Sequence, residues 1–144
     1  QIIRRDLFVA AGGFDEGLRY CEDWHFWCLL ATRSPFAYRP DLCVMEYRIH
    51  ASSTMHARVR PFSDFAPALE AIFRDEAVRA RVPAGELARL KRAANASLLT
   101  YVATEAIRLR DYGSSLRSAL RAIAEAPGRA PNVVLRVCGT FARL

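Results

Sequence analysis

The chain has 144 residues, about the length of one ordinary domain, of which 52% are hydrophobic and 25% are charged. This balance excludes a wholly disordered, collagen-like or disulfide-scaffold protein, and no apolar run approaches the ~18 residues that a membrane-spanning helix needs. The formal net charge is +6, and it is unevenly distributed. Residues 1–58 hold seven Arg and seven acidic residues, so the whole excess falls in residues 59–144.

The first residue and the cysteines bear on whether the chain is a fragment and on the compartment where it resides. It opens with Gln1 and lacks the charge-then-apolar order of a signal peptide, so we expect a fragment or a processed product. The four cysteines have no secreted-scaffold spacing, which is typical of reduced, buried thiols in a cytoplasmic protein.

The first part of the chain is predicted to mix short helices and strands. A helix over residues 5–11 is followed by Gly12, which suits a left-handed C-cap. A second helix over residues 22–32 has acidic residues in its first turn, where the helix dipole favours ionised carboxylates. Strands are predicted over residues 36–38 and 42–49. The second helix has one predicted apolar face, formed by Trp24, Trp27, Cys28 and Ala31.

The second part of the chain is predicted to be helical throughout. Apolar spacing indicates amphipathic helices over residues 64–81, 86–109, 114–126 and 132–144. Their arginines are expected to form solvated faces. The sequence therefore predicts two units, an α/β unit over residues 1–58 and a helical extension over residues 59–144.

Three short motifs in the first unit carry residues suited to chemistry, at positions 12–16, 22–24 and 47–50. A glycine pair lets the backbone approach a ligand closely, and a carboxylate can accept a proton from a hydroxyl nucleophile. Arg and His can neutralise phosphate oxygens, and His can also bind a divalent metal. Together these groups suit the transfer of a group from a phosphorylated donor to a hydroxyl.

In order and spacing, these motifs resemble the second half of a family 2 glycosyltransferase with the GT-A fold. The resemblance covers roughly residues 1–55, a little over a third of the chain. It rests on Arg4-Arg5-Asp6-Leu7-Phe8, Gly12-Gly13-Phe14-Asp15-Glu16, Glu22-Asp23-Trp24, Trp27 and Tyr47-Arg48-Ile49-His50. It implies that residues 1–58 are the acceptor-side, C-terminal portion of a GT-A α/β domain.

The resemblance also implies a mechanism. Such enzymes transfer a sugar, with inversion, from a nucleotide-diphosphate sugar to a hydroxyl of a glycan or lipid-linked acceptor. Asp23 matches the catalytic base, and Glu22 matches an acidic neighbour near the acceptor. The positions matched to substrate binding are Gly12, Gly13, Trp24, Arg48 and His50. His50 also matches a histidine that contacts the diphosphate or the metal in some relatives.

The sequence departs from the family pattern in two ways. The acid that often follows the Trp, and the Arg four residues further on, are replaced by His25 and Leu29. The family's Asp-x-Asp motif, which binds Mg²⁺ or Mn²⁺, occurs nowhere in the 144 residues. We therefore expect the donor-binding half, which would hold most of the metal site, to lie upstream of Gln1.

Structural interpretations of the same residues remain open. Glu22 and Asp23 are also what a helix N-terminus ordinarily carries, and Gly12-Gly13 is also what a C-cap and turn require. His50 would also suit a structural role at a strand end. The spacing of Cys21, His25 and Cys28, with Cys43, would allow a zinc site, but a packed apolar stripe needs no fourth convergent ligand.

The basic second unit raises the question of a macromolecular partner. Its arginines are spread along amphipathic helices and form no recognition motif, so nucleic acid is not the favoured partner. The last helix would suit peripheral contact with an anionic membrane, because Arg129, Arg136 and Arg143 accompany Val134, Val137 and Phe141. The alternative to an enzyme is a non-catalytic helical interaction or nucleic-acid-binding module on a degenerate transferase remnant.

One prediction concerns the isolated chain. Because it lacks the donor-binding motif, we expect the 144-residue chain alone to transfer no sugar. Release of nucleoside diphosphate from a panel of nucleotide sugars, with acceptor alcohols and Mg²⁺ or Mn²⁺, measures this. Release above that of a heat-denatured sample would contradict the prediction.

Overall fold

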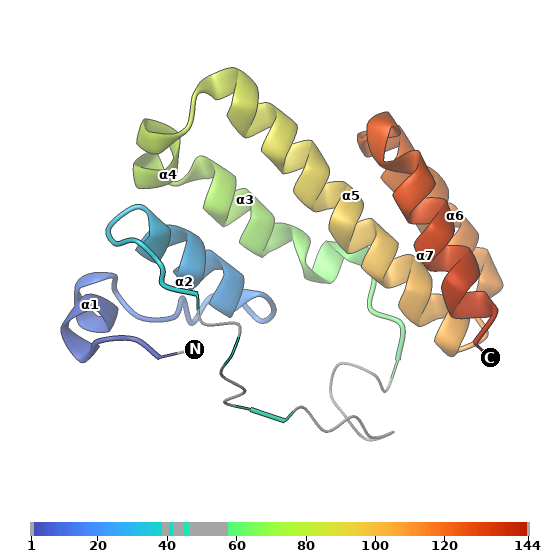
Figure 1. Cartoon of the computed structure of the whole chain (residues 1–144), viewed down its shortest axis with the longest axis horizontal. Coiled ribbons are helices and arrows are strands. Elements are labelled where there is room, and N and C mark those ends of the chain that lie inside the picture. Colours follow the sequence, from blue (N-terminus) through green and yellow to red (C-terminus); the bar gives the residue numbers. More distant parts are fainter. Residues whose placement is uncertain (1, 39–40, 42–44, 47–57, 144) are drawn as a thin grey trace.

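The computed structural model describes residues 2–38, 41, 45–46 and 58–143. This part of the chain is an assembly of helices (Figure 1). A short N-terminal unit of two helices lies at one end, a long diagonal helix crosses the middle, and two packed helices lie at the other end. None of the helices among these residues is long and apolar enough to cross a bilayer.

The expected α/β character is wrong for the part that the structure describes. Residues 36–38 form no strand, and neither do Met45 and Glu46, while the rest of the predicted strand 42–49 lies outside the described residues. A strand needs a neighbour to pair its N–H and C=O groups. Instead of facing a sheet, the Phe36 ring packs edge-on against Trp27, with 6.2 Å between ring centroids. The described residues therefore form no portion of a GT-A α/β domain.

The N-terminal unit contains helices α1 (Arg5–Ala10) and α2 (Glu22–Ala31), which confirm the two predicted helices. The predicted apolar face of α2 is wrong, because Trp24 is 44% exposed and Ala31 is also exposed. The buried residues of α2 are Phe26 and Leu30, since the first helix and the turn after it pack on that side.

Helices α3 (Ala66–Arg74) and α4 (Glu76–Arg81) replace the single predicted helix 64–81, and a 3₁₀ turn, η1 (Phe62–Asp64), precedes them. The break is at Asp75, which has an extended backbone with ψ 131°. Its carboxylate accepts hydrogen bonds from the backbone N–H groups of Ala77 (2.8 Å) and Val78 (3.1 Å). Asp75 therefore starts a new helix, a role that Asp performs well because its side chain satisfies free N–H groups.

Helix α5 (Ala84–Arg108) is the long diagonal helix of Figure 1. Helix α6 (Tyr112–Glu125), the 3₁₀ turn η2 (Pro127–Arg129) and helix α7 (Ala130–Phe141) follow it. These confirm the three helices predicted after residue 85. Every residue of α5 from 98 to 107 is buried except Tyr101, so this half of the helix is covered on all sides.

Two clusters of apolar side chains bury α5. On one side, Leu98 and Val102 pack against Phe65 and Leu69 of the α3 region. On the other side, small residues dominate the contact with α6 and α7: Ala96, Leu99, Ala103, Ala119, Ala122 and Val133. Alanine lets helix axes approach closely because it has only a methyl side chain.

The start of α4 provides a test of the fold. We expect Asp75→Ala to lower the free energy of unfolding by about 1 kcal/mol, because two helix N–H groups lose their acceptor. Asp75→Asn should retain most of the stability, since Asn caps a helix about as well. Urea denaturation followed by circular dichroism measures both. An Asp75→Ala protein as stable as wild type would contradict the capping role.

Candidate functional site

The glycine pair ends α1 and begins the turn toward α2. Gly12 has φ 87° and Gly13 has φ 70°, left-handed values that glycine adopts without strain. Their N–H groups donate to the carbonyls of Val9 (3.0 Å) and Phe8 (3.1 Å), as a C-cap requires. A side chain on Gly13 would lie 3.3 Å from the Phe8 ring, whereas nothing lies within 4 Å of the corresponding position on Gly12. The backbone at Gly12 is therefore open to an approaching group.

An aromatic cluster joins this turn to α2. Phe14, from the Gly-Gly-Phe-Asp-Glu turn, lies with its ring centroid 5.5 Å from Phe8 and 5.1 Å from Phe26. Phe26 is fully buried and also contacts Phe8 (5.0 Å) and Trp27 (5.0 Å). Edge-on and tilted ring contacts of this kind stabilise packing beyond the area that they bury. The first two motifs therefore belong to one packed unit.

The two predicted carboxylates lie in the first turn of α2. Asp23 is exposed, and its Oδ1 accepts a hydrogen bond from the backbone N–H of Trp24 (2.8 Å). Glu22 precedes it and is partly buried. Trp24 is 44% exposed, so a flat apolar ring stands beside an accessible carboxylate.

The residue before these acids has an unusual backbone. Cys21 has φ 60° and ψ 25°, a left-handed conformation that costs a non-glycine residue on the order of 1 kcal/mol. Such conformations are retained where the surrounding structure holds them, and they concentrate at functional sites. Here Cys21 is packed beside the buried cluster of Phe65 and Leu69, which holds the turn in place.

The thiols near the acids are kept protonated. Burial, together with the negative charges of Asp23 and Glu22, raises the pKa of Cys21 to about 11. Burial also raises the pKa of Cys28. Both side chains are therefore neutral thiols at neutral pH, which agrees with structural rather than nucleophilic roles.

A buried arginine connects the motif-bearing unit to the helical part. Arg60 is 7% exposed, and its guanidinium lies over the Tyr20 ring, 4.4 Å from the centroid. It donates a hydrogen bond to the Tyr20 hydroxyl and approaches the Asp64 carboxylate to 3.8 Å. The Tyr20 ring also packs on Phe65, with 5.9 Å between centroids. The segment before Glu22 and Asp23 is thus fixed to the start of α3.

The structure describes only some of the residues of the predicted site. It places five of the predicted residues in the N-terminal unit: Gly12, Gly13, Glu22, Asp23 and Trp24. Arg48 and His50 lie outside the described residues, so their predicted roles in substrate or metal binding remain predictions. In the part of the chain that is described, no three His, Cys, Asp or Glu side chains are grouped to hold a metal, and Cys21, His25 and Cys28 do not form such a group.

His25, which the sequence marked as a departure from the family pattern and as a possible zinc ligand, has an unsatisfied polar atom. Its Nδ1 is buried and has no hydrogen-bond partner among the described residues. The residue stands where relatives of the resembled family often carry an acid. A buried nitrogen without a hydrogen-bond partner is an energetic cost to the fold.

An apolar groove of about 530 Å³ lies between α2, α4 and α5. Cys28 and Ala31, from the predicted apolar face of α2, line this groove instead of a closed core. Phe73 of α3 and Leu90 of α5 also line it, together with Arg81 and Arg129. Apolar spacing along α2 predicted an apolar surface here but could not show that it is open.

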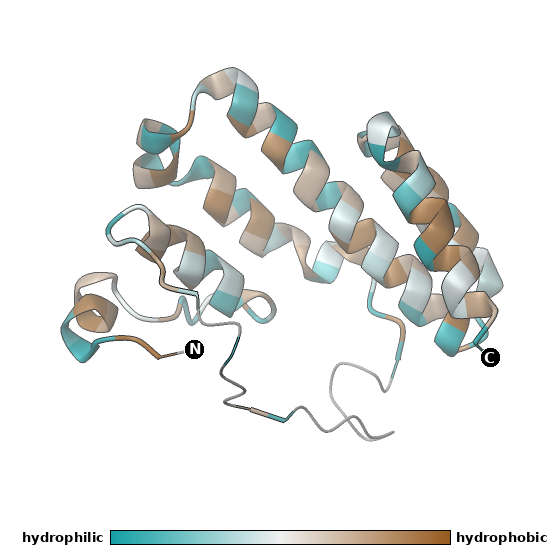
Figure 2. Ribbon diagram, in the orientation of Figure 1, coloured by the Kyte–Doolittle hydropathy of each residue, from teal (hydrophilic) through white to brown (hydrophobic). Residues whose placement is uncertain are grey.

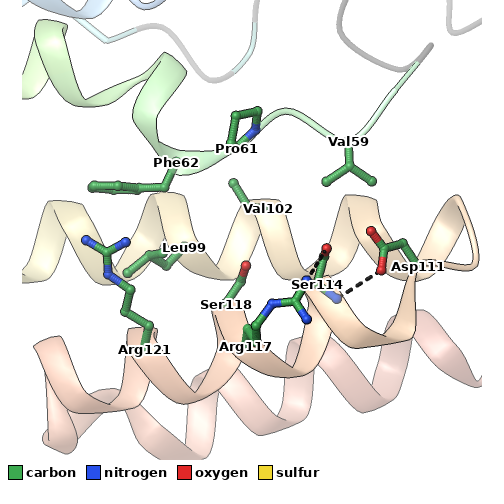
Figure 3. A pocket seen from close by; sticks show the side chains of 10 residues that line it. All are labelled: Val59, Pro61, Phe62, Leu99, Val102, Asp111, Ser114, Arg117, Ser118 and Arg121. Carbon is green, nitrogen blue, oxygen red and sulfur yellow. Dashed lines mark hydrogen bonds between the residues drawn. The ribbon is translucent and has the colours of Figure 1, made fainter.

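A second cavity of about 530 Å³ lies between the segment before α3 and the helices α5 and α6 (Figure 3). Arg117 donates to the Ser114 hydroxyl (3.0 Å), and Arg121 lies over the Phe62 ring, 4.8 Å from its centroid. The Asp111 carboxylate accepts a hydrogen bond from the Ser114 N–H (2.9 Å). Hydrogen bonds from Ser114 and the charge of Arg117 lower the pKa of Asp111.

None of the residues predicted from sequence lines this second cavity. Its two guanidinium groups and two serine hydroxyls are suited to an anion. The sequence did contain a signal, because Ser114, Arg117, Ser118 and Arg121 recur at helical spacing. That signal alone does not predict the cavity, because the segment carrying Phe62, which forms another wall, lies about 50 residues earlier in the sequence.

Comparison of the chain with known protein families, curated proteins and solved structures finds no match. A functional assignment therefore rests on the motifs and on the geometry described above.

The raised pKa of Cys21 gives a direct test of the charge at the start of α2. We expect Asp23→Asn to lower the pKa of the Cys21 thiol, because one of the negative charges that raise it is removed. The thiolate fraction at pH 8–9 then rises, and alkylation by iodoacetamide becomes faster. The reduced nucleophilicity of a weaker base offsets only part of this gain.

Mass spectrometry of the Cys21 peptide measures the rate against pH. Glu76→Gln, which removes a carboxylate from the first turn of α4, is the control and should leave the rate unchanged. An unchanged rate in Asp23→Asn would mean that the Asp23 charge does not reach the thiol.

Proposed function

We propose that this chain carries the acceptor-side catalytic base of a glycosyltransferase that uses a nucleotide-diphosphate sugar. The observation that carries the proposal is the contact between Phe14 and Phe26, with 5.1 Å between ring centroids. It brings the Gly-Gly-Phe-Asp-Glu turn and the helix beginning with Glu22 and Asp23 into one unit. The sequence predicts that these two motifs act together, and the contact supports that prediction.

The proposed role of Asp23 is to remove a proton from the acceptor hydroxyl. The carboxylate takes the proton as the hydroxyl oxygen forms a bond to the anomeric carbon of the donor sugar. At the same time, the bond from that carbon to the diphosphate oxygen breaks, and the diphosphate leaves with the bonding electrons. Attack from the side opposite the leaving group inverts the anomeric centre.

Three local features favour this role for Asp23. The carboxylate is exposed, so an acceptor can reach it. It lies in the first turn of α2, where its Oδ1 accepts a hydrogen bond from the Trp24 N–H, and a carboxylate can act as the proton acceptor. The partly exposed Trp24 ring next to it offers an apolar face for the acceptor to lie against.

Charge on the departing diphosphate needs cationic partners. The resemblance assigns this to Arg48 and His50, and to Mg²⁺ or Mn²⁺, which would neutralise the diphosphate when bound. No three His, Cys, Asp or Glu side chains are grouped to hold that cation among the described residues, which do not include Arg48 and His50.

The decisive variant is Asp23→Asn in the full-length protein, expressed with whatever residues its gene encodes ahead of Gln1. We expect kcat to fall by about 10²–10⁴-fold, because an amide cannot accept the proton. Donor affinity should not change, since the base faces the acceptor. Transfer assays with nucleotide sugars and calorimetric titration of the donor measure the two quantities.

Glu76→Gln serves as the matched control, because it also removes an exposed first-turn carboxylate but lies on α4. It should retain wild-type activity. Transfer by Asp23→Asn within twofold of wild type would overturn the proposed base, and salt-steep DNA or RNA binding without transfer would favour the interaction module.

A further inference from the structure

An exposed apolar face runs along the outside of helices α6 and α7. Its six residues are all exposed to solvent: Tyr112, Leu116, Leu120, Val134, Cys138 and Phe141. We call this set the α6–α7 apolar face. Leu116 is 62% exposed and Leu120 is 59% exposed, which is unusual for leucines four residues apart on a packed helix.

The two halves of this face form one surface. On α6 the residues stand at i, i+4 and i+8, and on α7 at i, i+4 and i+7, so each helix presents a single stripe. Tyr112, at the start of α6, packs on Phe141, at the end of α7, with 5.8 Å between ring centroids. The helices are therefore antiparallel neighbours with their stripes side by side, and brown, hydrophobic segments are visible on α7 in Figure 2.

The stretch of chain that contains these two helices, residues 112–143, carries most of the basic excess. Residues 112–143 contain a single acidic residue, Glu125, and it accepts a hydrogen bond from Asn95 (3.2 Å). The five basic residues in this range are Arg117, Arg121, Arg129, Arg136 and Arg143. Five positive charges against one negative give +4 of the chain's total of +6.

Two of these arginines flank the apolar stripe on α6. Arg117 and Arg121 each follow a leucine of the stripe, about 100° further around the helix. They line the cavity of Figure 3, where Ser114 and Ser118 supply hydroxyls. Exposed apolar side chains and arginines thus lie next to each other on the same helix.

We propose that the α6–α7 apolar face docks the protein on an anionic lipid bilayer. The six apolar residues enter the boundary between headgroups and acyl chains, and Arg117 and Arg121 contact lipid phosphates. Amphipathic helices rich in arginine bind bilayers in this way, through buried apolar area and attraction to anionic lipid together. The proposal is independent of the glycosyltransferase assignment.

Charge favours a bilayer over a second copy of the chain. Pairing two copies through this face would bring together two hairpins of +4 each, with one acidic residue apiece. Anionic lipid instead supplies the opposite charge across the whole surface.

The structure also changes which residues take part. The last helix alone was expected to provide the contact, through Val137 and Arg129 among others. Val137 instead packs against the core cluster, and the Arg129 guanidinium donates to the Ser97 hydroxyl (2.9 Å). Val134 and Phe141 of α7 remain exposed as expected, and α6 adds Tyr112, Leu116 and Leu120, which were not assigned to any partner.

Co-sedimentation with vesicles tests the proposal on the full 144-residue chain. We expect binding to vesicles of phosphatidylcholine with 30% phosphatidylglycerol, weakening as salt is raised, and much weaker binding to pure phosphatidylcholine. The double variant Leu116→Ser/Leu120→Ser should weaken binding to the anionic vesicles at least about tenfold, because two leucines no longer bury apolar area. Arg117→Gln/Arg121→Gln should weaken it by roughly 25-fold.

The control is Val9→Ser, which removes an exposed aliphatic side chain (67% exposed) from α1, in the unit at the other end of the molecule. It should bind vesicles as wild type does. Circular dichroism should show that all variants remain folded, since the changed side chains are exposed. Absence of binding to anionic vesicles, equal binding by the leucine double variant, or a dimer that this variant disrupts without vesicle binding would each overturn the proposal.

Discussion

The arrangement of this protein depends on covering one half of one helix. From residue 98 to residue 107, α5 has almost no side exposed to water, and a helix in that state is stable only with partners around it. The α3 region supplies one partner, and α6 with α7 supplies the other. Once those contacts are made, the outer faces of α6 and α7 have nothing left in the described part of the chain to cover them.

The motif-bearing unit reaches this helical core through few groups. Arg60, Tyr20 and Phe65 form the connection, and a buried guanidinium is tolerated there because an aromatic face, a hydroxyl and a carboxylate surround it. The same contacts fix Cys21 in its left-handed conformation. The position of Asp23 therefore depends on contacts with the start of α3, which lies far from the Glu22-Asp23-Trp24 motif in the sequence.

Apolar spacing near 3.6 predicted α5, α6 and α7 from the sequence. The Gly12 cap indicated α1, and the first-turn acids Glu22 and Asp23 indicated α2, although the apolar face predicted for α2 was wrong. The sequence did not predict the break at Asp75, because an Asp that caps a helix and an Asp inside a helix cannot be distinguished until the backbone conformation is known. The prediction of a strand over residues 36–38 was wrong. A short apolar segment does not show which partner its side chains will contact, and Phe36 packs on Trp27 instead of on a sheet. The candidate catalytic residues could be proposed from sequence because they lie in short, local motifs. The arginine-lined cavity was missed because segments distant in the sequence form it.

The connection between Tyr20 and Phe65 has a consequence for synthesis on the ribosome. The N-terminal unit emerges first, but its partner follows 45 residues later (65 minus 20). At 5–20 residues per second, this delay is about 2 to 9 s, far longer than helices need to form. During that time the Tyr20 and Cys21 side of the unit is uncovered. By contrast, α5, α6 and α7 are consecutive in the chain, so each can pack on the preceding helix as soon as it is made. The delay between synthesis and native contact is therefore shorter for these helices.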